Sequence, residues 1–210
     1  MAWAPDYCTV AELKTHLRIA DTDDDTPLAI AVTAASRAVD HACNRQFGQT
    51  DPAAARYYTY DGACHDVGVG YRQMLEIDDL MTTTSLVVKV DRDDDGTFEE
   101  TLVEGTDFRL FPWNAAANGR PWSHIILLSG EAFPYQPRAV EVTAKWGWTA
   151  VPSIVKQATL IQAARFFQRR NSPYGVAGSP DLGNELRLLS RLDPDVAVML
   201  SSVLRPWVVR

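Results

Sequence analysis

The run Asp91-Arg-Asp-Asp-Asp-Gly96 has the residue types and spacing to bind a metal ion. It matches the first half of an EF-hand calcium loop, in which carboxylate oxygens surround the cation. That loop needs a bidentate glutamate at its twelfth position, which is Leu102 here, and the flanking residues favour strands rather than helices. We interpret the run as an acidic hairpin turn, and calcium binding by Asp91–Asp95 stays open as an alternative.

Other metal and catalytic patterns are incomplete. The zinc-ligand types His41, Cys43, Cys64 and His65 form no pair of Cys-x₂₋₄-Cys clusters. The acidic run Asp21–Asp25 lacks a glycine and a regular ligand register, so it fits a solvated connector better than a metal site. No Gly-x-Ser-x-Gly elbow, dinucleotide fingerprint or P-loop is complete. We therefore predict no enzyme activity and no catalytic, cofactor-binding or metal residues.

Composition sets the broad class of the protein. The 210 residues carry a net charge of −7 and are 46% hydrophobic, which argues against a general nucleic-acid coat. Three widely spaced cysteines favour reduced thiols. The N-terminus has no basic and apolar signal-peptide pattern, and no apolar run approaches a membrane span. We expect a soluble protein made in the cytosol, with no membrane association.

Helices are predicted at both ends of the chain. Thr9 and Glu12 have capping-box spacing, which predicts a first helix with Leu13 and Leu17 on one face. Thr26-Pro27 predicts the start of a second helix that runs to about Gln46. Near the C-terminus, Val151-Pro152 starts a helix that ends at Arg169-Arg170-Asn171, and Asp193-Pro194 starts a short final helix.

The middle of the chain favours strands. Leu86–Val90 and Thr97–Val103 flank Asp95-Gly96, which is a strong hairpin signal. Further strands are predicted at 107–111, 125–128 and 139–146, so we expect an antiparallel sheet of about five strands. The fold class is α+β: a helical bundle with an inserted antiparallel β-rich domain. The predicted parts are residues 1–50 (helical hairpin), 51–149 (β-rich insertion) and 150–210 (helices and a docking tail).

Charge and aromatic residues are distributed unevenly. The three parts carry net charges of −3, −8 and +4, so a basic C-terminal part follows an acidic body. Trp207 follows a proline beside Val208 and Val209, between Arg205 and Arg210. This composition is typical of a docking peptide, and a tail folded back on its own core is the alternative.

Three segments resemble the head–tail connector (adaptor) proteins of long-tailed phages, in versions found in phages of actinobacteria. Residues 9–19, the acidic run 21–25 and residues 28–47 are similar to the N-terminal signature of that family. Residues 146–165 are similar to its C-terminal helix, and Asn171–Gly178 and Leu192–Val196 also resemble family members. The resemblance covers roughly residues 7–47 and 140–205. The long β-rich middle departs from the smallest adaptors.

The resemblance implies a structural virion protein without enzyme activity. Such a protein forms a homo-oligomeric ring, dodecameric in the assembled neck, and is present in the host cytoplasm during assembly. It binds the portal on one side and a stopper or tail-completion protein on the other, and DNA passes through its lumen. Because C-terminal segments reach the portal in that family, the docking candidates here are Arg165, Arg169, Arg170, Arg205, Trp207, Val208 and Arg210.

Three other functions are kept as alternatives. A stopper or tail-terminator protein would occupy another position in the same neck, but those folds are mainly β. A calcium-binding β module would use Asp91–Asp95. A DNA-packaging protein with a helical DNA-binding hairpin is disfavoured by the acidic N-terminal part.

Overall fold

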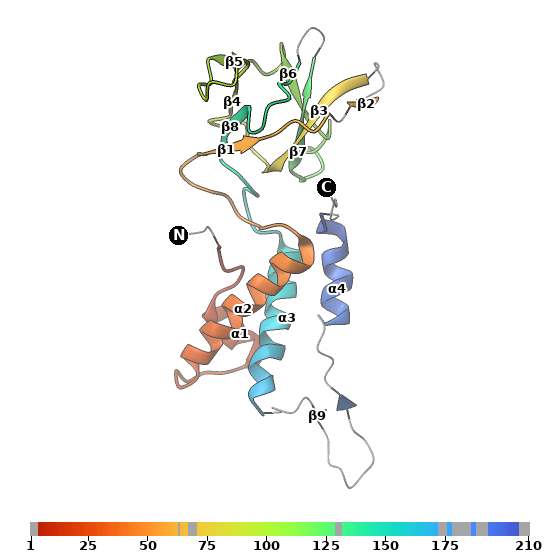
Figure 1. Cartoon of the computed structure of the whole chain (residues 1–210). Coiled ribbons are helices and arrows are strands. Elements are labelled where there is room, and N and C mark those ends of the chain that lie inside the picture. Colours follow the sequence, from red (N-terminus) through yellow and green to blue (C-terminus); the bar gives the residue numbers. More distant parts are fainter. Residues whose placement is uncertain are drawn as a thin grey trace. The chain divides into compact units, whose positions relative to one another are not determined.

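A computed structural model describes residues 4–62, 64–66, 71–128, 132–171, 176–177, 186–187 and 193–205. The chain forms two compact units (Figure 1). The helical unit consists of Met1–Phe47 and Val151–Arg210, and the β unit consists of Gly48–Ala150. The predicted α+β class is confirmed, with helices at both ends of the chain and strands between them.

Helix α1, Val10–Leu17, begins with the predicted capping box. The Thr9 hydroxyl accepts the backbone N–H of Glu12 at 3.2 Å, and the Glu12 carboxylate accepts the backbone N–H of Thr9 at 2.9 Å. Each side chain thus satisfies a backbone donor that the first turn leaves unpaired. The helix ends where Arg18 adopts a left-handed conformation, with φ of 59°.

Helix α2, Asp25–Cys43, differs from its predicted bounds at both ends. Its N-cap is Asp24 rather than Thr26, and Pro27 lies within the first turn, where its missing N–H breaks no hydrogen bond. The helix stops before the predicted Gln46, because Asn44 takes a left-handed conformation and donates its N–H to the Asp40 carbonyl. Asparagine tolerates this conformation better than most residues.

Helix α3, Ser153–Gln168, follows Pro152 and runs into the 3₁₀ turn η1, Arg169–Asn171. Helix α4, Pro194–Leu200, is capped by Asp193 as predicted and continues into the 3₁₀ turn η3, Ser201–Val203. Helices α2 and α4 both pack on α3 and also contact each other. In the part of the chain that the structure describes, no helix is long and apolar enough to cross a membrane.

The core of the helical unit joins the N-terminal segment, α1, α2 and α3. Its small and aliphatic side chains allow the helices to approach closely. The buried members of this cluster are Cys8, Leu13, Leu28, Ala31, Val32, Ala35, Ala163, Ala164 and Phe167.

The β unit contains two four-stranded antiparallel sheets. The first has the order β1-β8-β4-β5 and the second β2-β3-β7-β6. Their strands are β1 Ala54–Tyr58, β2 Cys64–Asp66, β3 Tyr71–Leu80, β4 Val87–Val90, β5 Glu100–Leu102, β6 Phe108–Phe111, β7 Trp122–Leu127 and β8 Val140–Ala144. In the helical unit, the short strands β9 Val176–Ala177 and β10 Leu186–Arg187 pair with each other.

The predicted single sheet of about five strands is therefore wrong. The strands divide between two sheets whose buried side chains form one core, with Val88 and Val142 from the first sheet and Ile77 and Ile125 from the second. The predicted pairing of residues 86–90 with 97–103 is correct, since Val88 lies opposite Leu102 and Val90 opposite Glu100. Asp95-Gly96 lies inside the longer connection between these strands and is not a two-residue turn.

Candidate docking site

The predicted docking residues Arg165, Arg169 and Arg170 lie at the C-terminal end of α3 and in the turn η1. Positive charge is favourable there, because the last carbonyls of a helix carry partial negative charge. The arrangement of α3 thus places three guanidinium groups within two turns of backbone.

Arg165 holds α4 against α3. Its guanidinium lies 3.4 Å from the carboxylate of Asp193, the residue that caps α4. The Asp193 carboxylate also accepts the N–H of Asp195 at 3.0 Å, and the Asp193 N–H donates to the Gln162 side chain at 3.4 Å. Because both side chains of the ion pair are largely buried, Arg165 positions α4.

Arg170 connects α3 to α2. Its guanidinium donates two hydrogen bonds to the carboxylate of Asp24, one of them at 2.7 Å, and lies over the Phe167 ring at 4.2 Å. The hydrogen bonds from Arg170 hold the pKa of the Asp24 carboxyl below its usual value. Since Asp24 is the N-cap of α2, Arg170 joins the end of one helix to the beginning of another.

Arg205 lies at the other end of α2. Its backbone N–H donates to the carbonyl of Cys43, the last residue of that helix, at 2.9 Å. Asp24 and Cys43 are about 28 Å apart along the helix axis, at 1.5 Å per residue. Arg170 and Arg205 therefore do not share one basic patch. Trp207, Val208 and Arg210 lie outside the described residues.

Two further ion pairs, which the sequence analysis missed, tie the helices together. The ammonium group of Lys156 on α3 contacts the Glu12 carboxylate of α1, and Lys14 on α1 lies 2.7 Å from the Asp25 carboxylate of α2. The hydrogen bond from Lys156 is the largest cause of the lowered pKa of Glu12. The opposite charges of the two terminal parts could have indicated the Lys156–Glu12 pair from sequence, but not the Lys14–Asp25 pair, which lies within the N-terminal part.

A buried polar cluster fixes the N-terminal segment on α2. The Tyr7 hydroxyl donates to the Asp40 carboxylate and accepts the N–H of Phe47 at 2.9 Å. Arg37 forms an ion pair with Asp40 at 3.0 Å, and the Tyr7 N–H donates to the Ser36 hydroxyl at 3.1 Å. Burial raises the pKa of Asp40, while the hydrogen bond from Tyr7 and the charge of Arg37 act in the opposite direction.

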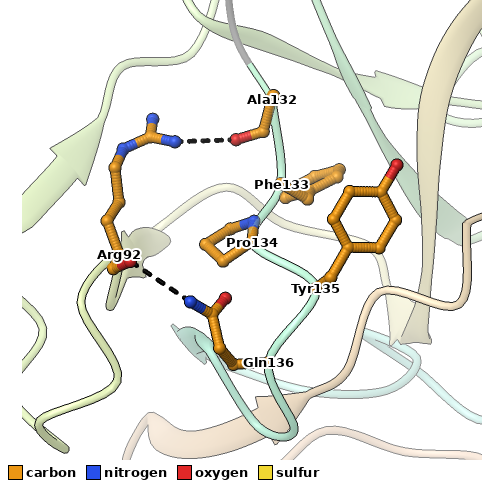
Figure 2. Close-up of a pocket in the computed structure, with 6 residues that line it drawn as sticks. All are labelled: Arg92, Ala132, Phe133, Pro134, Tyr135 and Gln136. Carbon is orange, nitrogen blue, oxygen red and sulfur yellow. Dashed lines mark hydrogen bonds between the residues drawn. The ribbon is translucent and has the colours of Figure 1, made fainter.

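A cleft of about 470 Å³ lies on the β unit (Figure 2). Arg92 spans one side of it, with its guanidinium donating to the Ala132 carbonyl at 2.9 Å and its own carbonyl accepting from Gln136 at 3.2 Å. Phe133, Pro134 and Tyr135 form the opposite side. Among the lining residues that the structure describes, Tyr135 has a hydroxyl but no histidine or carboxylate accompanies it, so these residues form no acid–base or nucleophilic pair.

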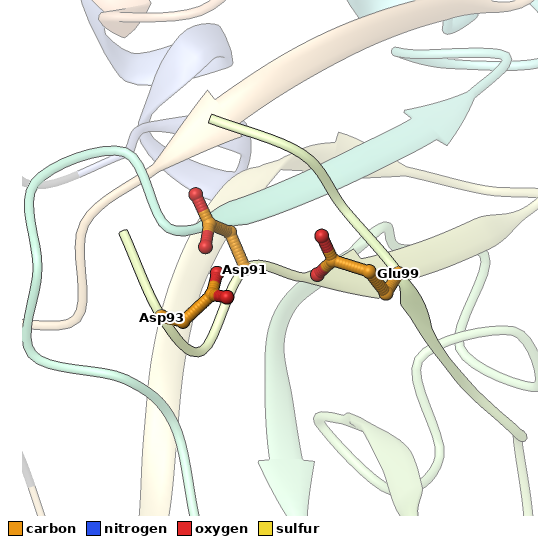
Figure 3. Close-up of side chains that lie close together, drawn as sticks. All are labelled: Asp91, Asp93 and Glu99. Carbon is orange, nitrogen blue, oxygen red and sulfur yellow. The ribbon is translucent and has the colours of Figure 1, made fainter. Parts of the chain in front are cut away.

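The carboxylates of Asp91, Asp93 and Glu99 gather in the loop between β4 and β5 (Figure 3). One oxygen from each lies within 4.8 Å of the others, which is a spacing that could hold a cation. Asp91 is buried, however, and its two oxygens accept the N–H groups of Asp94 and Gly96 at 2.8 and 2.9 Å. The loop joins two strands, so the helices of an EF-hand are missing. Asp91 thus organises the loop.

The residues considered for zinc do not form a described cluster. His41 is exposed and Cys43 is buried, so they diverge from α2. The side chains of Cys64 and His65 lie outside the described part of the chain.

Comparisons with known proteins agree with the resemblance seen in the sequence. Residues 7–64 match the family model of the phage gp6-like head–tail connector protein. The fold is similar to a chain from the neck of an empty gene transfer agent particle, computed with C6 symmetry, with a TM-score of 0.56 and 20% identity. That alignment covers 100% of this chain and 95% of the other.

A second similar structure is a chain from the virion of a native gene transfer agent particle. Its TM-score is 0.54 at 22% identity, and the alignment covers 97% of this chain and 92% of that one. No curated protein matches the chain. The resemblance to phage head–tail connector proteins is therefore confirmed over residues 7–64, which match that family's model, and the fold of nearly the whole chain is similar to those of two chains from gene transfer agent particles.

Proposed function

We propose that this protein is a structural head–tail adaptor, which forms a ring below the portal and links the capsid to the tail. The observation that carries the proposal is the connector-family match over residues 7–64. The likeness of the whole fold to a neck chain in a particle computed with C6 symmetry supports a cyclic assembly. We further propose that the ring contains twelve subunits and lies between the portal and a stopper or tail-completion protein.

The charges of the two units are consistent with this role. The β unit carries sixteen acidic and eight basic residues and is therefore strongly negative. The helical unit, with eleven acidic and twelve basic residues, is almost neutral. An acidic surface repels the DNA backbone. If the β unit lines the lumen of the ring, DNA would therefore slide through it rather than bind to it. The protein would act in the virion neck after assembly in the host cytoplasm.

For portal docking we propose the C-terminal tail that begins at Arg205. Arg165 and Arg170 would act indirectly, since their ion pairs with Asp193 and Asp24 position α4 and α2. Arg169, Trp207, Val208 and Arg210 complete the proposed docking set. Deleting residues 206–210 preserves the hydrogen bond from the Arg205 N–H to Cys43, so the helical unit should stay folded.

The test is to mix the purified chain with the portal protein of the same particle and examine the sample by electron microscopy. We expect a ring of this chain stacked on the portal ring. The variant lacking residues 206–210 should keep its circular dichroism spectrum and lose co-sedimentation with the portal. Absence of any ring with the full chain would refute the adaptor role, and full binding by the truncated chain would refute the docking role of the tail.

A further inference from the structure

The loop between β6 and β7 presents an exposed aromatic side chain on the β unit. Trp113 is 47% exposed, and its ring lies edge-on to that of Phe111 with the ring centroids 5.3 Å apart. Apart from Ala115 and Pro121, residues 112–121 are all exposed. A tryptophan that is oriented by one aromatic neighbour and otherwise open to solvent is typical of an anchor side chain at a protein–protein contact.

The same loop carries a positive charge that is not compensated within the subunit. Arg120 is exposed, and among the described residues it has no carboxylate partner. Residues 112–121 contain no acidic residue. The carboxylates on the neighbouring part of β3 already have partners within the chain: Glu76, Asp78 and Asp79. The loop therefore offers an aromatic ring and a free guanidinium to a partner.

The cleft on the β unit is a hollow that matches this aromatic ring (Figure 2). Its volume of about 470 Å³ is sufficient for an aromatic side chain. Phe133 and Pro134 are buried and Tyr135 is 69% exposed, so the cleft has an apolar wall with an open edge. The guanidinium of Arg92 lies on the opposite side. An inserted tryptophan would pack on the apolar wall and attract the guanidinium to its ring face.

Exposed carboxylates lie next to the cleft in the loop between β4 and β5. Arg92 belongs to this loop, and the Glu100 carboxylate compensates its charge. Arg138, on the segment that follows the cleft, lies over the Tyr57 ring at 4.8 Å. In the part of the chain that the structure describes, four exposed carboxylates of the loop form no ion pair: Asp93, Asp94, Asp95 and Glu99. Four carboxylates against the one guanidinium of Arg138 give the cleft a negative surrounding, which favours a cation on the partner.

The loop and the cleft lie at opposite ends of the β unit. At the cleft end, the Asp91 N–H donates to the carbonyl of Ala139, just before β8 begins. Beyond the other end of β8, Gly147 bridges to Leu80, and Leu80 lies opposite Trp122, where the β6–β7 loop ends. The five residues of β8 span about 16 Å at about 3.3 Å per residue. The loop therefore does not reach the cleft of its own chain.

We propose that Trp113 of one copy inserts into the cleft beside Tyr135 of a second copy, and that Arg120 of the first copy lies against the carboxylates of the β4–β5 loop of the second. This inference rests on the proposed ring and names a contact within it. The loop matches the cleft in both respects, with an aromatic ring for the apolar wall and a guanidinium for the carboxylates. Because the two surfaces differ and lie at opposite ends of one unit, the contact is head to tail, as in cyclic rings.

The direct test mixes two variants of the full chain. Trp113→Ala removes the inserted ring and keeps the cleft, whereas Tyr135→Ala removes part of the cleft and keeps the loop. Each variant alone should self-associate at least tenfold more weakly than the unmodified chain in sedimentation. Their equimolar mixture should form heterodimers that grow no further, because only one intact loop and one intact cleft are available to each pair. A mixture that associates no better than the separate variants, or variants that associate as strongly as the unmodified chain, would overturn the contact.

A charge reversal provides a second measurement that does not depend on removing an aromatic ring. Arg120→Glu should leave the melting temperature unchanged, because the side chain is exposed, and should weaken self-association at least tenfold. Adding Asp93→Lys and Glu99→Lys to the same chain should restore it, since the charges of the two surfaces are then exchanged. Ile30→Ala is the matched control, because Ile30 is 66% exposed but belongs to the helical unit. Equal weakening by Arg120→Glu and Ile30→Ala would contradict the contact.

Electron microscopy with the portal separates this inference from the proposed function. Loss of the portal-bound ring in Trp113→Ala and in Arg120→Glu would support the contact. Unaltered rings of both variants would show that other surfaces form the ring, so the contact would be wrong and the adaptor role would stand. Absence of a ring with the unmodified chain would refute the adaptor role. The mixing experiment then decides the contact by itself, since it needs only two chains.

Discussion

Replacing Tyr7 with phenylalanine tests the buried cluster that fixes the N-terminal segment on α2. The substitution removes only the hydroxyl, which donates to the Asp40 carboxylate and accepts the Phe47 N–H. A hydrogen bond to a charged group contributes about 1.5–3 kcal/mol, and a buried unpaired N–H costs about 1–3 kcal/mol. The Asp40 side chain is 14% exposed, so water can replace part of the loss. We expect the helical unit to lose about 3 kcal/mol of unfolding free energy.

Urea unfolding followed by two signals measures this change. Circular dichroism at the helical minimum follows the helical unit, and tryptophan fluorescence follows mainly the β unit, which contains four of the six tryptophans. With a slope of about 1–3 kcal/mol per molar urea, the helical transition should move down by 1 M or more. The tryptophan transition should not move. Tyr135→Phe is the matched control, because Tyr135 is 69% exposed on the β unit.

The loss should also depend on pH. Burial raises the pKa of the Asp40 carboxyl in the folded state. The stability that this raised pKa contributes is therefore fully present below the unfolded-state pKa of about 3.9, and it is lost as the pH rises through the folded-state pKa. Removing the Tyr7 hydroxyl raises the folded pKa further. The deficit of Tyr7→Phe should therefore be larger at neutral pH than near pH 4. A loss below about 1 kcal/mol, or a loss that shrinks as pH rises, would refute this account of the cluster.

Three further perturbations test other parts of the fold. Arg170→Ala should lower the melting temperature at low salt and have little effect at about 1 M salt, because the pair with Asp24 is exposed to screening; an equal loss at both salts would contradict an electrostatic role. Asp91→Ala should destabilise the β unit by about 2–3 kcal/mol in tryptophan-monitored urea unfolding, since two backbone N–H groups lose their acceptor, while Asp93→Ala should leave it unchanged. Millimolar calcium should not change the melting temperature, because Asp91 is already engaged; a rise that a chelator reverses would instead establish a cation site.

The helices of this protein were predictable because their signals are local. The Thr9–Glu12 capping box and the Asp193 cap occupy their predicted positions, since each depends on residues within one helical turn. The start of α2 was misplaced for a non-local reason. Asp24 carries no capping hydrogen bond of its own, and its carboxylate instead pairs with Arg170, far away in the sequence.

Strand β3 was missed because its acidic residues have distant partners. Asp78 and Asp79 lie near the end of β3, and aspartate is uncommon in strands. In the fold, Asp78 pairs with Arg56 and accepts from the Tyr58 hydroxyl, and the buried Asp79 accepts from the Trp148 indole at 3.0 Å. A register irregularity between Glu76 and Leu80 also disturbs the alternation that identifies strands. Only the paired structure makes these residues compatible with a sheet.

The candidate site was predictable in its residue types but not in their roles. From sequence, the basic C-terminal part was expected to contain the docking residues. In the fold, Lys156 and Arg170 of the basic part pair with Glu12 and Asp24 of the acidic part. These two pairs join the two ends of the chain into one helical unit, so Lys156 and Arg170 act within the subunit.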